Sequence, residues 1–97
     1  MIRVRFEKNR LTVRGHAGYA ERGEDIVCAA VSALVYALIG VLQERGLVRE
    51  LVIRPGYVML CAGGACEAEL ELVRCGLEQL QARYGAFVSV ENTVQGS

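Results

Sequence analysis

The sequence lacks an excess of charge of either sign, and this absence limits the partners that its composition predicts. Eleven lysines and arginines balance 11 aspartates and glutamates over 97 residues, so the formal net charge is zero. A chain without net charge has no overall attraction to nucleic acid or to an anionic membrane. We therefore expect no direct nucleic-acid binding and no membrane partner.

The amino terminus also lacks the cationic and apolar segments of a secretory signal peptide, so we expect a cytoplasmic protein. The chain has one histidine and no CxxC pair, which argues against a zinc ribbon and against a thiol redox motif. In a cytoplasmic chain the cysteines are expected to be reduced thiols, and we expect neither a metal nor another cofactor. The four thiols belong to Cys28, Cys61, Cys66 and Cys75.

Residues 26–42 form an uncharged run of 17 residues. This length is at the lower limit for crossing a bilayer, and the run contains Ser32, Tyr36 and Gly40. We therefore interpret it as a central helix of a globular domain, covered on most sides by a sheet and by partner surfaces.

Alternating apolar residues predict strands over residues 1–7 and 10–14, and shorter apolar runs predict strands over 51–53, 57–61 and 87–90. A second helix is predicted over residues 66–84, where apolar residues recur at intervals of four and three. The order is β-β-α-β-β-α-β. The predicted fold is a single α+β domain over residues 1–97, with two helices packed on a mixed or antiparallel sheet.

The first two predicted strands carry an excess of positive charge. Their cations are Arg3, Arg5, Lys8, Arg10 and Arg14, against Glu7 alone. The alternation places the arginines on the outward face of the sheet. That face is either simply solvated or a surface that meets RNA or an acidic partner.

Chemically reactive side chains gather where the uncharged helix begins. A glycine-punctuated segment over residues 15–25 holds His16, and Cys28 follows 12 residues later. The segment is long for a connection in a compact domain, which favours a functional or mobile loop. If Asp25 caps the helix, Cys28 lies in the first turn, where the helix dipole and a nearby imidazolium stabilise a thiolate.

The acidic residues in this segment have several possible roles. Glu24 or Asp25 caps the helix, opposes ionisation of the thiol, or orients the imidazole. The amides of the first turn are candidates for polarising a substrate carbonyl. On the helix, Cys28, Ser32, Tyr36 and Gly40 share one stripe, which lines a cleft or a close helix contact. The other three cysteines are expected to fill the core.

The string GHAGYAERGEDIVCAAVSAL resembles the signature of the ribosomal-processing cysteine proteases, the Prp family. The resemblance implies a homodimeric, cytoplasmic endopeptidase that removes an amino-terminal extension from a large-subunit ribosomal protein, a cut needed for ribosome assembly. It implies that Cys28 is the nucleophile and His16 the general base. Gly15, Asp25 and Ser32 become supporting or substrate-binding candidates, and the implied substrate is extended and apolar, with aromatic residues at the cut.

The alternative is a non-catalytic, ribosome-associated binding module that uses the arginine-rich strands. Both hypotheses predict binding, whereas only the protease hypothesis predicts cleavage.

Overall fold

The computed structural model describes residues 1–16, 18 and 25–93. The elements follow the predicted order β-β-α-β-β-α-β. They are β1 (Ile2–Glu7), β2 (Arg10–Arg14), α1 (Ile26–Glu44), β3 (Val48–Arg54), β4 (Tyr57–Ala62), α2 (Glu67–Tyr84) and β5 (Val88–Asn92). The largest difference from the prediction is β3, which is longer at both ends than residues 51–53. Its additional residues are paired with β4 across a register shift between Val48 and Glu50.

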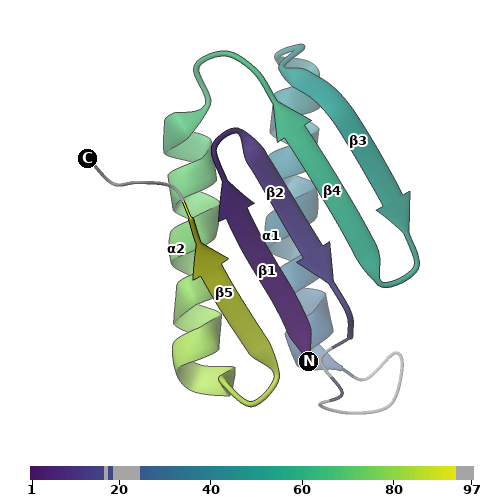
Figure 1. The fold of residues 1–97 in the computed structure, drawn as a ribbon, viewed down its shortest axis with the longest axis vertical. Coiled ribbons are helices and arrows are strands. Elements are labelled where there is room, and N and C mark those ends of the chain that lie inside the picture. The colour runs from purple at the N-terminus through teal and green to yellow at the C-terminus, as the bar shows by residue number, and fades with distance from the viewer. Residues whose placement is uncertain (17, 19–24, 94–97) are drawn as a thin grey trace.

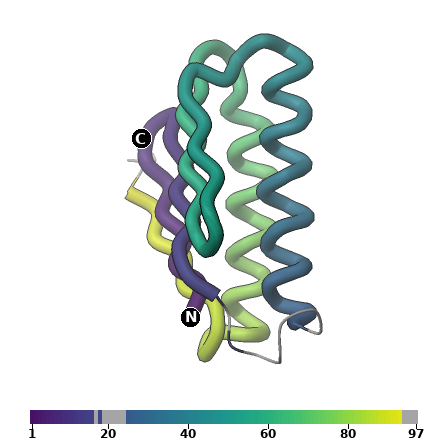
Figure 2. Tube along the Cα trace, turned by 90° about the vertical axis from the view of Figure 1, so that its right-hand side faces the viewer, coloured from purple at the N-terminus to yellow at the C-terminus, as the bar shows by residue number. Residues whose placement is uncertain are grey.

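The five strands form one mixed sheet in the order β3-β4-β2-β1-β5. β1 and β5 run parallel, while the other neighbouring strands are antiparallel. Figure 1 shows the strands in front of both helices, and Figure 2 shows α1 and α2 together on one side of the sheet. Among the described residues, the opposite face of the sheet therefore carries no helix.

The core lies between the sheet and the two helices. Four of the strands supply alternate residues to it, such as Ile2, Val4 and Phe6 from β1, whereas β3 contributes only partly buried residues. The predicted stripe of α2 is confirmed, since Cys66, Val73 and Leu77 are buried and its other members, Leu70, Leu80 and Tyr84, pack against the core. The other buried core residues are Leu11, Val13, Val27, Val31, Val35, Leu38, Ile39, Leu42, Leu60, Ala62 and Val88.

Helix α1 begins at Ile26, as the sequence predicts, and ends at Glu44, two residues beyond the uncharged run. Asp25 is the N-cap, Arg45 is the C-cap, and Gly46 follows with φ +67°. By length and composition the helix is able to cross a membrane, a test that apolar core helices also pass. It packs on the sheet through one face only. Its outer face is exposed, including Ile26 and Tyr36, so the described residues of one chain do not supply the expected cover on most sides.

Two of the three cysteines predicted to fill the core do not do so. Cys66 is buried, but Cys75 is exposed and lies off the apolar stripe of α2. Cys61 is half-buried because it alternates with the core residues Leu60 and Ala62, which places it on the helix-free face of the sheet.

Candidate active site

A cleft of about 160 Å³ lies where the beginning of α1 meets one end of the sheet. Its floor is apolar and comes from Ile2, Val13, Val35 and Val58. Its chemically functional walls are formed by His16, Cys28, Ser32, Tyr36, Arg54 and Tyr57, with Gly15 and Gly56 between them. The structure thus brings the predicted nucleophile and the predicted base to one cleft.

Cys28 is positioned by the cap of α1. The Oδ1 atom of Asp25 accepts hydrogen bonds from the amides of Val27 (3.0 Å) and Cys28 (2.9 Å). Asp25 is therefore the capping residue, and Cys28 occupies the third helical position, as the sequence predicts. These two amides are already bonded to a carboxylate. This bonding removes them as ready donors to a substrate carbonyl, one of the possible functions of the first turn.

Two glycines position His16. The amide of Gly15 donates to the carbonyl of Gly56 (2.8 Å), which fastens the end of β2 to the turn between β3 and β4. Gly15 has φ +91°, and a Cβ atom there would collide with the carbonyl oxygen of Met1. At Gly56, a Cβ atom would lie 3.0 Å from Nε2 of His16. The imidazole therefore lies close over Gly56, and a side chain there would require it to shift by a few tenths of an ångström.

The stripe predicted along α1 lines the cleft over three of its four members. Cys28, Ser32 and Tyr36 belong to the lining, whereas Gly40 does not and faces open space. Tyr36 remains 48% exposed at the rim. The stripe therefore marks a cleft along the first three turns of the helix only.

The turn between β3 and β4 contributes to the cleft in a way that the sequence patterns do not predict. Arg54, Gly56 and Tyr57 complete the cleft. The Pro55-Gly56 pair is typical of a tight turn, and Gly56 has φ +69°, as position three of a type II turn requires. The sequence patterns do not reveal that β4 pairs with β2, and this pairing places the turn next to His16.

Part of the predicted loop lies outside the described residues. Glu24, the alternative capping residue, and Gly23 belong to that part, so the predicted mobility of residues 15–25 stays a prediction. Within residues 1–16, 18 and 25–93, no group of three or more His, Cys, Asp or Glu side chains is arranged to hold a metal ion.

The second cysteine at a helix start provides an electrostatic contrast to Cys28. Burial raises the pKa of the Cys66 thiol, and the nearby carboxylates of Glu67 and Glu69 raise it further. Cys66 also makes no side-chain capping bond at the start of α2. It is therefore held as a neutral core thiol, unsuited to nucleophilic attack near neutral pH.

The sequence is similar to known proteins along most of its length. Residues 1–89 match the family model of the cysteine protease Prp. The ribosomal processing cysteine protease Prp of Mycoplasma pneumoniae is 30% identical over 95 residues, which cover 95% of each chain. That of Mycoplasma genitalium is 47% identical over 36 residues, covering 37% of this chain and 36% of the relative.

Solved structures share the fold. The ribosomal processing protease Prp from S. aureus, in complex with a covalently linked product peptide, superposes with a TM-score of 0.85 at 19% identity, covering 96% of this chain and 100% of the other. SMU.848 from Streptococcus mutans superposes with a TM-score of 0.78 at 26% identity, covering 98% and 96%.

Proposed function

The chain belongs to the cysteine protease Prp family, and from this membership we propose that it removes an amino-terminal extension from a large-subunit ribosomal protein during ribosome assembly. It is a cysteine protease and hence a hydrolase. The observation that carries the more specific proposal is that His16 and Cys28 line one cleft with an apolar floor. Membership of a protease family argues against the alternative hypothesis, a purely non-catalytic binding module.

We propose that Cys28 and His16 act as a catalytic dyad. The thiolate of Cys28 attacks the carbonyl carbon of the scissile bond, and the carbonyl electrons move to the oxygen. As this tetrahedral intermediate collapses, the C–N bond breaks and the imidazolium of His16 donates its proton to the leaving amine. The result is a thioester between Cys28 and the amino-terminal product.

The second half of the reaction uses the same two residues. Neutral His16 accepts a proton from a water molecule, and the resulting hydroxide attacks the thioester carbonyl. The C–S bond breaks, which releases the amino-terminal product as a carboxylic acid and returns the thiolate–imidazolium pair. Each step moves protons and electron pairs among the two side chains, the peptide and one water molecule.

The supporting residues divide into two kinds. Asp25 and Gly15 act on the reactive groups indirectly, since Asp25 caps the turn that carries Cys28 and Gly15 anchors the segment that carries His16. Ser32 lines the cleft one turn after Cys28 and is proposed to contact the substrate. The apolar floor and the ring of Tyr36 suit an extended apolar peptide with aromatic side chains.

We further propose that the protein acts in the cytoplasm as a homodimer. The uncharged outer face of α1 supports the dimer, because exposed small and apolar residues extend along it without cover from the described part of the chain. These exposed residues are Ile26, Ala29, Ala33, Tyr36, Ala37 and Gly40.

Cleavage of a synthetic peptide that spans the ribosomal extension tests the proposed function. The wild-type protein should cut it once, and Cys28→Ala and His16→Ala should each reduce the rate by at least about a hundredfold, the usual contribution of such groups. Cys75→Ala is the matched control, because it removes an exposed thiol far along α2 and should retain full activity. Cleavage that survives Cys28→Ala would overturn the assignment of the nucleophile.

A further inference from the structure

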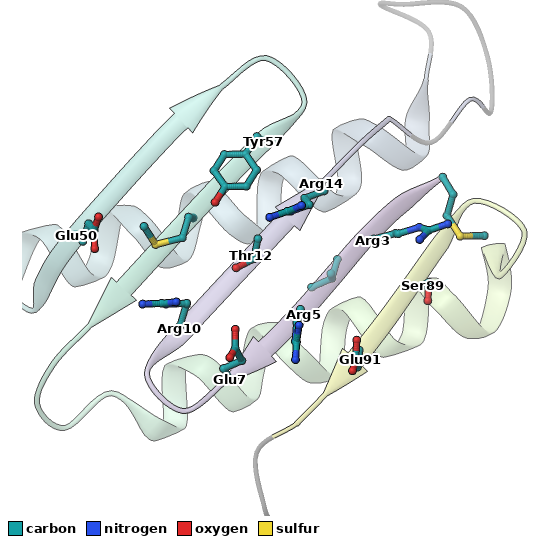
Figure 3. A pocket seen from close by; sticks show the side chains of 13 residues that line it. Arg3, Arg5, Glu7, Arg10, Thr12, Arg14, Glu50, Tyr57, Ser89 and Glu91 are labelled. Carbon is teal, nitrogen blue, oxygen red and sulfur yellow. The ribbon is translucent and has the colours of Figure 1, made fainter.

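The helix-free face of the sheet carries arginines that form no ion pair with the described residues. Arg3, Arg5, Arg10 and Arg14 all line a shallow hollow of about 740 Å³ on this face (Figure 3). The ion pairs formed within residues 1–16, 18 and 25–93 involve Arg45 and Arg74, and none involves these four arginines. Their charges are therefore available to a partner.

The charges are sorted along the strands. At the end of the sheet next to the catalytic cleft, the strand register places Tyr57, Arg14, Arg3 and Ser89 side by side across β4, β2, β1 and β5. We call these four residues the basic row. It contains no acidic residue, whereas the hollow's acidic residues, Glu7, Glu50 and Glu91, lie farther along the strands (Figure 3). A chain with zero net charge thus presents a local positive stripe.

The centre of the basic row has an electrostatic cost in the absence of a ligand. Arg3 and Arg14 are directly opposite each other on antiparallel strands, an arrangement that is destabilising for like charges. The guanidinium of Arg14 lies over the ring of Tyr57, 5.3 Å from its centroid, a cation–π contact that acts against this repulsion. An anion bound between the two guanidiniums would relieve it.

The basic row is continuous with the catalytic cleft. Tyr57 lines both the hollow and the cleft, and its register partner Arg54 lines the cleft. His16 follows Arg14 at two residues' distance along the chain. A molecule lying on the row would therefore reach the rim of the proposed active site.

We propose that the basic row binds the phosphate backbone of single-stranded RNA. Guanidiniums form paired, charge-assisted hydrogen bonds with phosphate, and proteins that bind single-stranded RNA combine such cations with aromatic side chains, here the half-buried Tyr57. An RNA strand offers successive phosphates that could contact the neighbouring guanidiniums of Arg3 and Arg14. The choice of RNA over another polyanion rests on the proposed function, since a ribosomal substrate is found in the company of ribosomal RNA. The net charge of zero led us to expect no nucleic-acid binding. Net charge does not show that the fold places Arg3 and Arg14 together, apart from the acidic residues.

Fluorescence anisotropy with a labelled 12-nucleotide single-stranded RNA tests the proposal on the full chain. The double variant Arg3→Gln/Arg14→Gln should lose roughly tenfold or more in affinity at 50 mM salt, because two cations that bind phosphates are removed. The salt dependence should also weaken, by about 0.7 in the slope of log K against log salt for each phosphate that is no longer neutralised. The matched control, Lys8→Gln/Arg83→Gln, removes the same charge from exposed positions outside the row and should bind like the wild type.

Four results would overturn the proposal: no binding of the RNA at low salt, equal losses in the two double variants, an unchanged salt slope, or tighter binding of a 12-residue polyglutamate, which would indicate an acidic protein partner. Melting curves show whether the double variant folds. If it does not, Arg3→Gln alone, which leaves the contact between Arg14 and Tyr57, should produce half the change in slope. Two measurements separate a failure of this proposal from a failure of the protease assignment. The variant Cys28→Ala should still bind RNA, and the variant Arg3→Gln/Arg14→Gln should still cleave the isolated peptide.

Discussion

The imidazole of His16 lies over Gly56, so closely that a Cβ atom at Gly56 would be 3.0 Å from Nε2. The two residues are far apart in the sequence, and the pairing of β2 with β4 brings them together. A tight turn thus forms part of the wall against which the proposed base is positioned.

Substitution of this glycine should lower both activity and stability. In Gly56→Ala the new methyl group presses on Nε2 of His16, so the imidazole must shift by a few tenths of an ångström. We expect a measurable loss in rate, smaller than the roughly hundredfold that a misplacement of about 1 Å in a catalytic group costs. The positive φ of +69° adds a backbone cost of about 1–2 kcal/mol in the free energy of unfolding. Peptide cleavage and thermal unfolding measure the two effects separately.

Gly46→Ala is a matched control for this prediction. Gly46 has nearly the same backbone angle, φ +67°, but a Cβ atom there meets nothing within 4 Å. The control should therefore lose similar stability and keep its activity. Equal activity in the two variants would show that the position of His16 does not depend on Gly56.

Asp25 is expected to act through the geometry of the helix start. Asp25→Ala removes the acceptor for two amides and should lower the free energy of unfolding by about 1 kcal/mol. Asp25→Asn keeps an oxygen acceptor and should retain both stability and the greater part of the activity. If Asp25→Asn is as inactive as Asp25→Ala while it remains stable, the charge of Asp25 is needed and its role extends beyond the cap.

The four thiols should differ in reactivity. Limiting iodoacetamide at neutral pH should label Cys28 first and abolish cleavage in step with labelling, because a helix start and an imidazole favour the thiolate. The exposed Cys75 is the competitor for the reagent, so the experiment is best done in a Cys75→Ser background. His16→Ala should slow the labelling of Cys28. Mass spectrometry that finds another cysteine modified first, with activity intact, would contradict the proposed nucleophile.

Cys66 should make the fold sensitive to alkaline pH. Its pKa is raised in the folded state by burial and by two glutamates, whereas an unfolded thiol ionises near its ordinary value of about 8.5. Above that value the unfolded chain releases a proton that the folded chain retains, so stability falls as the pH rises. Denaturant unfolding between pH 7 and 10 should show a smaller decline in Cys66→Ala than in the wild type. Parallel declines would show that Cys66 does not contribute.

The sequence alone could predict the elements and part of the cleft. Alternation identifies β1 and β2, Asp25 marks the start of α1, and the four-residue interval of Cys28 and Ser32 marks the cleft wall. The same local patterns also indicate where Cys61 and Cys75 lie. Cys61 alternates with core residues of β4, and Cys75 lies off the apolar stripe of α2. Strand order could not be predicted, because it depends on contacts between distant segments, and the contribution of Gly56 depends on that order.

The covalent intermediate offers the most direct test of the central claim, that Cys28 carries out the cut with His16 in the same cleft. The protein is mixed with the ribosomal-extension peptide, quenched in acid at successive times and analysed by intact mass spectrometry. We expect a transient adduct equal in mass to the amino-terminal product minus water, located on Cys28 by digestion and absent from Cys28→Ala. Peptide cleavage without such an adduct on Cys28 at any time, or with the adduct on a different cysteine, would contradict the account.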